Sequence, residues 1–515
     1  MQTHLAKQVE QIIDEGRGAT RSVIVQMKTD GRETRALLET ASQAVRHRSM
    51  LSTPREVLPP AISVLKAPRT GKRGAAKRRE LREAEQSMVS QVASRAVKSI
   101  TQKILRDAGL GFLEPLISSD LVMDAISRSS RGAKKKRKSL KRSVPRFWSS
   151  ASAVLELSKD DLHKLPREVS KIADIFPNRT LKVPPVVEIT SLPKNVDDNK
   201  TSAWGVHAIG ALSAWGAYGS RGKGVKVAVL DTGVDAKHPD LRGKLSDWAE
   251  FDRLGRMVSG SRPHDSDQHG THCAGTIAGG RESGQWIGVA PDAKIAGGLV
   301  LKRGSGTDAQ ILAGLQWALE VGSDVISMSL GGLRFGPDVL DTYSNTFISA
   351  NRLGVPVVVS IGNEGSQTSG SPGNDYFALA VGATDHEDRA AGFSGGRTQV
   401  IRESRFIRPD FLPLVYSKPD LSAPGVAVMS AIPGKKYATW NGTSMAAPHV
   451  SGAIALLLSA TSIKSEVAAP RRAYLLQEFL MGSVEELGEA GQDHRYGFGR
   501  LDIMRAIGFA KEGGY

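Results

Sequence analysis

The C-terminal part of this sequence predicts an α/β fold with a mainly parallel sheet. Three short apolar runs, at 227–230, 325–328 and 357–361, each lead directly into a turn that contains glycine. Apolar runs of this length indicate strands that are buried on both faces, as the strands of parallel sheets are. Small and apolar residues at 269–279 and 309–319 predict helices that pack on such a sheet.

The first of these runs ends in a carboxylate. Asp231 follows 227–230 directly and precedes a Thr-Gly turn. Functional groups of open α/β sheets lie at the carboxyl ends of the strands, so Asp231 is a candidate site residue. Two further carboxylates, Asp235 and Asp240, are interpreted as turn and cap residues.

A histidine opens the helix predicted at 269–279. His269 and His272 stand close enough on this helix that, taken alone, they also fit a pair of metal ligands. Cys273, the single cysteine of the chain, lies one helical turn after His269, and we interpret it as a small buried residue rather than a nucleophile. With one cysteine, no disulfide can form within the chain.

A serine stands between small residues near the C-terminus, where the sequence Asn-Gly-Thr-Ser-Met-Ala-Ala-Pro-His spans 441–449. Ser444 precedes a run, 453–460, that predicts a helix, so its hydroxyl is expected at or near a helix N-terminus. Unpaired N–H groups and the helix dipole favour negative charge there. A serine becomes a nucleophile only with a base and a group that orients the base; His269 and Asp231 are the candidates.

In the order Asp, His, Ser, these three motifs resemble those of the subtilisin-like serine proteases (subtilases), and the resemblance extends over 204–507. It implies a three-layer domain and a serine endopeptidase that acts through an acyl-enzyme. Ser444 would be the nucleophile, His269 the general base and Asp231 the carboxylate that orients it. Asn363, which follows the strand at 357–361, matches the oxyanion-hole amide of the family, a donor worth about 3–4 kcal/mol in the transition state.

Several glycine-rich segments also resemble the substrate cleft of this family. The segment after the strand at 325–328 would pair with the backbone of a polypeptide substrate, by strand addition, and 304–307 would form the opposite wall. The loop 365–373 would floor the first specificity pocket, where Glu364 is expected to tolerate a basic side chain. The residues expected to contact substrate are Ser329, Leu330, Gly331, Gly306 and Gly370.

Net charge is distributed unevenly along the 515 residues, a length that predicts two or more domains. The whole chain carries a formal charge of +16. Residues 1–200 contain 39 Lys and Arg against 22 Asp and Glu, whereas 201–515 contain 30 against 31. The basic excess therefore lies upstream of the domain that resembles a protease.

The upstream part predicts a small α+β domain. Strands are expected at 22–27, 153–157 and 172–179, and a helix at 33–46; Ser158 is expected to cap a second helix. This order is similar to the inhibitory propeptide of subtilases, which implies a domain that acts as an intramolecular inhibitor; the alternative is an unrelated α/β module. We expect its two parts at 1–59 and 147–183, a basic helical insertion at 60–146, a linker at 184–203 and the catalytic domain at 204–515. Self-cleavage is expected between residues 182 and 204.

The insertion contains an amphipathic segment at 88–104 and a basic run from Lys134 to Arg142. Such a run is commonly a solvated loop, but it also fits a site for nucleic acid or an anionic surface, or a protease-sensitive activation loop. The alternative function is therefore a regulated effector, in which this N-terminal region binds a partner and controls the protease domain.

Metals, cofactors and membrane spans are not expected. Residues 279–288 lack the asparagine-rich calcium loop of several subtilases, and Asp240 alone does not make a site that needs six or more oxygens. Residues 1–20 show no signal-peptide pattern, and no run of about 18 apolar residues occurs. A cytoplasmic location is therefore expected. The long connection 397–417 is expected to form a surface lid or partner site.

Overall fold

The computed structural model describes residues 201–336, 339 and 341–515, and upstream of them the stretches 20–28, 113–129, 143–169 and 173–188, with residues 9–10, 12–14, 102–103, 106–107 and 110–111. The helix expected at 33–46, most of the amphipathic segment 88–104 and the basic run 134–142 lie outside the described residues.

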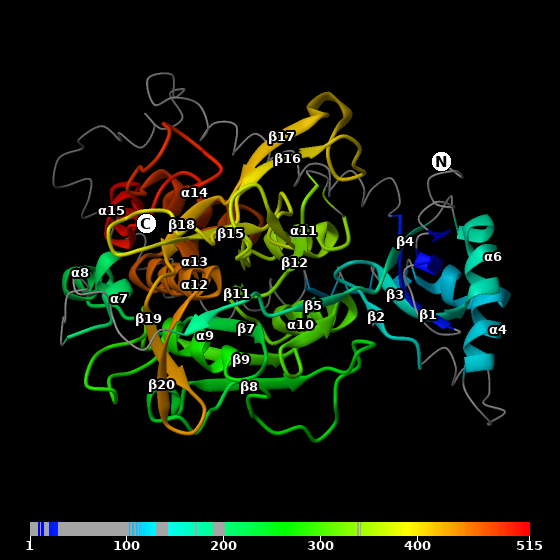
Figure 1. Ribbon diagram of the computed structural model, residues 1–515, viewed down its shortest axis with the longest axis horizontal. Coiled ribbons are helices and arrows are strands. Elements are labelled where there is room, and N and C mark those ends of the chain that lie inside the picture. The colour runs from blue at the N-terminus through cyan, green and yellow to red at the C-terminus, as the bar shows by residue number, and fades with distance from the viewer. Residues whose placement is uncertain are drawn as a thin grey trace.

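A seven-stranded sheet forms the centre of the C-terminal part, and every pair of neighbouring strands in it is parallel (Figure 1). The strand order is β18-β15-β13-β11-β7-β9-β8. The strands are β7 (Lys226–Asp231), β8 (Leu245–Glu250), β9 (Lys294–Leu299), β11 (Val325–Met328), β13 (Val357–Ser360), β15 (Leu379–Thr384) and β18 (Leu421–Pro424). The three strands predicted from apolar runs are its central members, β7, β11 and β13.

Helices cover both faces of this sheet, which confirms the three-layer arrangement. Alternate residues of β7 point into two different hydrophobic cores: Val227 and Val229 into one, Ala228 and Leu230 into the other. The first core is completed by α9 (His269–Ala278) and α12 (Thr443–Ala460), and the second by α10 (Asp308–Glu320) and α11 (Ser344–Arg352).

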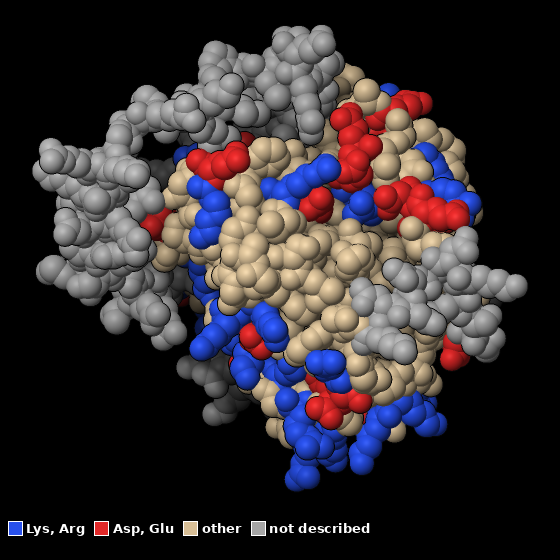
Figure 2. All heavy atoms as spheres, turned by 90° about the vertical axis from the view of Figure 1, so that its left-hand side faces the viewer, with Lys and Arg blue, Asp and Glu red and all other residues tan. Residues whose placement is uncertain are grey.

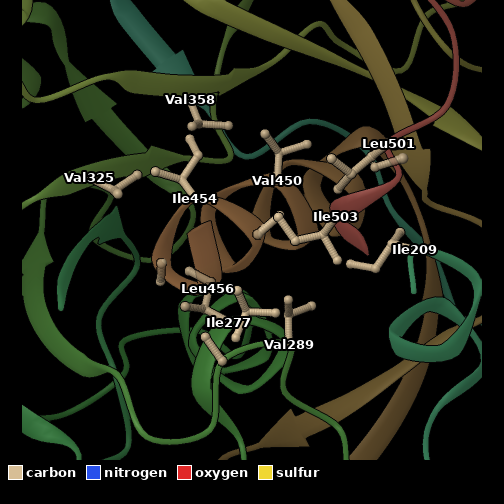
Figure 3. Packing of buried hydrophobic residues seen from close by; sticks show 14 of the residues in the cluster. Ile209, Ile277, Val289, Val325, Val358, Val450, Ile454, Leu456, Leu501 and Ile503 are labelled. Carbon is tan, nitrogen blue, oxygen red and sulfur yellow. The ribbon is translucent and has the colours of Figure 1, made fainter. Parts of the chain in front are cut away.

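The central helix of the first core is α12. Figure 3 shows Val450 and Ile454 of this helix close to Val358 of the sheet, and Leu456 beside Ile277 of α9. Among the described residues, α12 is the one helix with the length and hydropathy of a membrane span, but 89% of that window is buried inside the protein. Its apolar composition is therefore that of a core helix, surrounded by protein on all sides.

Upstream, the described residues form a four-stranded antiparallel sheet with the order β2-β3-β1-β4 (Figure 1). Its strands are β1 (Thr20–Met27), β2 (Arg146–Phe147), β3 (Ser152–Ser158) and β4 (Ala173–Pro177), and its helices are α4 (Asp120–Ser129) and α6 (Lys159–Val169). The Asp161 N–H donates to the Ser158 hydroxyl over 3.1 Å, which is the predicted helix cap. The strands expected at 22–27, 153–157 and 172–179 are thus present as β1, β3 and β4.

This smaller sheet lies between its own helices and the larger domain. Val23 and Val25 belong to a core of their own with the helices, whereas Ile24 and Val154 belong to the second core of the larger domain. Polar contacts support the docking: the Trp148 indole N–H donates to Glu320 over 2.8 Å. The opposite face of the antiparallel sheet is therefore covered by the α10 and α11 layer.

Further strands and helices complete the described structure. They are the strands β5 (Thr180–Lys182), β6 (Val187–Glu188), β10 (Ser305–Thr307), β12 (Gly332–Arg334), β14 (Ser369–Ser371), β16 (Arg397–Ile401), β17 (Leu414–Lys418), β19 (Val428–Ile432) and β20 (Lys436–Asn441), the helices α7 (Trp204–Ala208), α8 (Ala211–Tyr218), α13 (Ile463–Glu466), α14 (Ala469–Gly482) and α15 (Ile503–Glu512), and the 3-10 helices Pro239–Leu241 and Pro409–Phe411.

The connection 397–417, expected to form a surface lid or partner site, contains an antiparallel hairpin of β16 and β17 that stands out from the domain in Figure 1. Arg405, between its strands, contacts the Asp174 carboxylate of β4 over 2.8 Å. The segment expected as a linker, 184–203, includes the short strand β6.

Charges of both signs surround an uncharged area on the face at the left of Figure 1, where α7, α8 and α15 lie (Figure 2). This mixture agrees with the near balance of 30 basic and 31 acidic residues in 201–515. Large single-sign surfaces attract oppositely charged partners. Among the described residues on the face seen in Figure 2, Lys and Arg gather mostly in the lower half and Asp and Glu mostly in the upper half, so neither sign covers the whole face.

Candidate active site

The carboxyl end of β7 and the first residue of α9 bring an aspartate and a histidine together. Asp231 Oδ1 lies 2.8 Å from His269 Nδ1, and both side chains are buried. The same carboxylate oxygen accepts the Thr232 N–H over 2.7 Å. These contacts orient the imidazole so that its other nitrogen, Nε2, is free to act on a neighbouring group.

The protonated form of this histidine is stabilised. Burial lowers the pKa of His269, but the adjacent Asp231 carboxylate outweighs burial and holds the pKa well above its usual 6.5. The nearby Cys273 thiol contributes little charge at neutral pH, because burial raises the pKa of that thiol. The Asp231–His269 pair is therefore suited to accept and hold a proton during a reaction.

Ser444 is the second residue of α12, so the predicted position near a helix N-terminus is observed. Cys273 connects it to the histidine, since its Sγ lies 3.9 Å from His269 Nδ1 and 3.5 Å from the Ser444 carbonyl oxygen. The Ser444 hydroxyl and His269 Nε2 are both buried, and neither has a hydrogen-bond partner within the described part of the chain. Both groups are thus shielded from water, and neither is engaged in a structural hydrogen bond within the described part of the chain.

Pro448 explains why the backbone around Ser444 is bound by side chains. It lies four residues after Ser444 inside α12 and has no N–H, so the Ser444 carbonyl lacks its normal helical donor. The Ser329 hydroxyl donates to this carbonyl over 2.9 Å, and the Cys273 thiol over 3.5 Å. Ser329, expected to contact substrate, thus anchors the first turn of α12.

Asn363 follows β13 and faces the start of the same helix. Its Oδ1 accepts the Thr443 N–H over 2.8 Å and the Thr443 hydroxyl over 2.7 Å, which fixes the orientation of the amide. The opposite end of the amide, Nδ2, donates to the carbonyl oxygen of Pro185 over 2.6 Å. An amide held in this way presents a preorganised donor to a polypeptide carbonyl.

The carbonyl that Asn363 contacts belongs to an extended segment of the chain itself. Strand β5 pairs antiparallel with β10, where Leu181 lies opposite Gly306. On its other side, Lys182 and Gly331 exchange two backbone hydrogen bonds of 3.2 and 3.4 Å. The two segments expected to bind a substrate backbone therefore hold residues 180–182 between them.

The segment continues past the serine. The Val183 N–H donates to the Gly304 carbonyl over 3.0 Å, and β6 then pairs with β20, where Glu188 lies opposite Trp440. Residues 180–188 thus run from one side of the Ser444 region to the other. This path explains why the Ser444 hydroxyl is fully buried.

Part of the loop 365–373, predicted to floor the first specificity pocket, pairs with β12 in a small sheet. Gly370 of β14 lies opposite Leu333 of β12, and a Cβ atom on Gly370 would stand 3.0 Å from the Ile361 carbonyl. Leu330, also expected at the cleft, is fully buried. The Glu364 carboxylate accepts the Asn363 N–H over 2.9 Å, so one of its oxygens is engaged by the adjacent backbone.

Other candidate metal ligands are occupied by structural contacts. His272 stacks on Trp440 with ring centroids 4.5 Å apart, its Nε2 lies 3.2 Å from two carbonyl oxygens, and burial lowers its pKa to about 3. The Asp240 oxygens accept the Glu282 N–H and the Tyr437 hydroxyl, each over 2.7 Å. Ligand atoms of Asp231, His269 and Cys273 do lie within 4.8 Å of one another, but the hydrogen bond between the first two accounts for that proximity.

The sequence placed Asn178 and Arg179 at the end of the upstream domain, but it did not predict the partners that hold them. Asn178 accepts the Ala309 N–H over 2.9 Å, and Arg179 forms an ion pair with Asp308 over 2.9 Å. A sequence signal for the partner side is the Thr-x-x-Gln pattern of Thr307 and Gln310, a capping box that begins a helix at Asp308.

Comparison with known proteins agrees with this geometry. Residues 222–499 match the model of the subtilase family. An intracellular serine protease of Paenibacillus polymyxa is 36% identical over 285 residues, 52% of this chain and 76% of that protein. Subtilisin NAT of Bacillus subtilis subsp. natto is 40% identical over 247 residues, 47% of this chain and 57% of the relative. Serine protease AprX of Bacillus subtilis (strain 168) is 34% identical over 357 residues, 63% of this chain and 73% of the relative.

The family match covers more than half of the chain, and it includes the strand that carries Asp231, the helix that begins at His269 and the helix that contains Ser444. The seven-stranded parallel sheet with helices on both faces is the fold that the motifs imply. The chain therefore belongs to the subtilase family and is a subtilisin-type serine endopeptidase.

Proposed function

We propose that this protein is an endopeptidase made as an autoinhibited, self-processing zymogen. The observation that carries the proposal is the path of residues 180–188, which pair with both walls of the cleft and present the Pro185 carbonyl to Asn363. A polypeptide substrate bound in the same way would be held by backbone hydrogen bonds, with its side chains in adjoining pockets.

In this proposal Ser444 attacks the carbonyl carbon of the scissile bond while His269 accepts the hydroxyl proton. Asp231 holds the imidazole and stabilises the imidazolium that forms. His269 then gives the proton to the leaving amine, and water hydrolyses the acyl-enzyme by the same route. The support is the buried Asp231–His269 contact of 2.8 Å and the unengaged Ser444 hydroxyl.

Asn363 supplies the donor for the oxyanion. Its Oδ1 is held by Thr443, so Nδ2 does not need to reorganise when negative charge develops on the substrate oxygen. Ser444 itself lies in the first turn of α12, where the helix dipole also favours negative charge.

The upstream sheet would act as the inhibitory domain, and residues 180–188 as its tail. Because β6 continues on the far side of Ser444, the tail crosses the site as an uncut chain. We expect self-cleavage within 182–204, and Pro185–Val186 is the bond that directly follows the carbonyl bound to Asn363. Cleavage there would separate the basic upstream part from a near-neutral enzyme.

The domain boundaries, a cytoplasmic location and the effector alternative remain predictions. The effector alternative depends on the basic run 134–142, which lies outside the described residues. The relative from P. polymyxa is named an intracellular serine protease. Absence of bound metal also remains an expectation, which activity in the presence of a chelator would check.

The decisive experiment compares wild type with Ser444→Ala. Both proteins are purified at full length, followed by intact mass over time, and treated with a fluorophosphonate probe. We expect wild type to be cleaved between residues 182 and 204 and to be labelled, and the variant to stay intact and unlabelled. Equal cleavage of both proteins would assign processing to another protease, and an intact, unlabelled wild type would contradict self-activation.

A further inference from the structure

The tail of the upstream domain places a guanidinium group in a buried acidic site. Arg179 Nε lies 2.9 Å from Asp308 Oδ2, and Nη2 lies 3.0 Å from Oδ1, so the contact is bidentate. The Arg179 backbone N–H also donates to Asp308 Oδ2 over 2.8 Å. The Asp308 side chain is 0% exposed.

The rest of the site is built around the same two groups. The Tyr343 hydroxyl donates to Asp308 Oδ1 over 2.6 Å, and both terminal nitrogens of Arg179 lie 3.4–3.5 Å from the Ser371 hydroxyl. The Asp308 N–H donates to the Arg179 carbonyl over 3.0 Å. The site around Asp308 thus binds both the backbone and the side chain of Arg179.

Charge balance defines what this site can hold. Without Arg179, the buried Asp308 carboxylate would still accept the Tyr343 hydroxyl and would still lie at the start of α10. No positive charge among the described contacts would then balance it. An unpaired buried charge is costly, so a cation is strongly preferred. The two parallel N–H···O contacts fit the planar guanidinium group better than the point charge of a lysine.

The Asp308 site lies beside the strand that is proposed to bind the substrate backbone. Asp308 follows β10 directly, and β10 is the strand that pairs with residues 180–182. Arg179 lies six residues upstream of Pro185, whose carbonyl contacts Asn363. A polypeptide that follows the path of 180–188 would bring its own residue at this distance to Asp308.

We propose that Asp308, with Tyr343 and Ser371, forms a subsite for an arginine side chain of the polypeptide substrate. That arginine lies six residues before the residue whose carbonyl contacts Asn363. In the intact chain the subsite is filled by Arg179, so the same contact anchors the inhibitory tail. The inference rests on the proposed function to the extent that 180–188 marks the path of the substrate.

Direct binding tests this subsite without requiring catalysis. A fluorescein-labelled peptide with the sequence of residues 178–188 is titrated with full-length Arg179→Gln/Ser444→Ala protein, and anisotropy gives its affinity. A second peptide carries citrulline in place of Arg179, which keeps the shape and removes the charge. The tail of the protein competes equally with both peptides, so the ratio of their affinities is unaffected by it.

We expect the arginine peptide to bind about thirtyfold more tightly, or more, because a buried, hydrogen-bonded charge pair is lost with citrulline. A matched peptide with citrulline in place of Lys182, whose side chain is exposed, should bind within about twofold of the original. Adding Asp308→Asn to the protein should bring the arginine-to-citrulline ratio close to one.

Equal affinities of the arginine and citrulline peptides, or binding of neither, would overturn the proposal. The comparison changes only the peptide, so it stays informative if Asp308→Asn impairs folding. If the proposed zymogen function were wrong, wild type would fail to be processed or labelled. The peptide comparison does not measure processing or labelling, so failure of the subsite and failure of the zymogen function can be distinguished.

Discussion

The side-chain amide of Asn363 donates to the carbonyl oxygen of Pro185 over 2.6 Å, while its own oxygen is held by Thr443. The residue proposed to stabilise a substrate oxyanion therefore already contacts a carbonyl of the same chain. Its two ends have different partners, which allows them to be altered separately. The contact also identifies the position along 180–188 that faces the reactive groups.

Asn363→Asp should retain both contacts with Thr443 and lose the donor aimed at the carbonyl. We expect kcat of the processed enzyme to fall by about 100- to 1000-fold with a small change in KM, because the lost bond acts mainly in the transition state. Steady-state kinetics on a peptide substrate gives the two constants. An unchanged kcat would remove Asn363 from the oxyanion hole, and an unchanged melting temperature would show that the fold is intact.

The protonation of His269 should depend on Asp231. In Ser444→Ala protein, we expect the His269 proton resonances to titrate with a midpoint above 6.5, because the carboxylate outweighs burial. Asp231→Asn in the same background should move the midpoint below 6.5, since burial alone lowers the pKa of an imidazole. NMR titration measures both, and a midpoint that does not move would show that Asp231 is not the cause.

The raised pKa of His269 also determines how the stabilising effect of the Asp231–His269 contact changes with pH. The folded pKa of His269 lies above the unfolded value of 6.5, so the contact stabilises the fold fully below pH 6.5. This contribution disappears as the pH rises through the folded pKa. The difference in unfolding free energy between the parent protein and Asp231→Asn should therefore shrink at alkaline pH.

The lowered pKa of His449 should make the unfolding free energy depend on pH in the opposite direction to that of His269. Burial lowers its pKa from 6.5 to about 4, so the unfolded chain takes up a proton before the folded protein does as the pH falls. Between pH 7 and pH 5 this group should cost about 2 kcal/mol of unfolding free energy. Urea unfolding of His449→Gln should show a smaller loss over this interval, by about that amount, whereas His207→Gln, at an exposed position, should behave as wild type.

Pro448 and Ser329 should be coupled through the Ser444 carbonyl. Ser329→Ala removes the 2.9 Å donor and leaves a buried carbonyl with the weaker thiol contact, which should cost about 1–2 kcal/mol. Pro448→Ala in that background supplies a helical N–H and should recover part of the loss. Additive effects in the double-mutant cycle would contradict this explanation.

Cys273→Ser should keep most of the activity. A hydroxyl at this position can still donate to the Ser444 carbonyl, and the thiol is buried rather than exposed to substrate. We expect kcat/KM within a few fold of wild type, because no step of the proposed mechanism uses the sulfur. A large loss of kcat at unchanged melting temperature would assign Cys273 a direct role.

Local sequence predicted the central strands and the candidate site residues. Short apolar runs predicted β7, β11 and β13, because strands buried on both faces need apolar side chains on both. The motifs around Asp231, His269 and Ser444 were identifiable because each combines a reactive side chain with the small residues that allow close packing. These features depend on residues close together in the chain, so a single sequence contains them.

The sequence predicted an intramolecular inhibitor, but tertiary structure alone decided which residues lie in the cleft and which contacts hold them. The pairing of Leu181 with Gly306 and the contact of Arg179 with Asp308 join segments that are more than 120 residues apart. Such contacts depend on the docking of the upstream sheet against α10 and α11, and no local pattern encodes it. The hairpin of β16 and β17 also depends on a distant segment, because Arg405 between its strands forms an ion pair with Asp174 of the upstream sheet. The sequence by itself thus determined the reactive groups, whereas the partners of the cleft were decided by packing between distant segments, because burial and hydrogen bonding are satisfied only in the assembled fold.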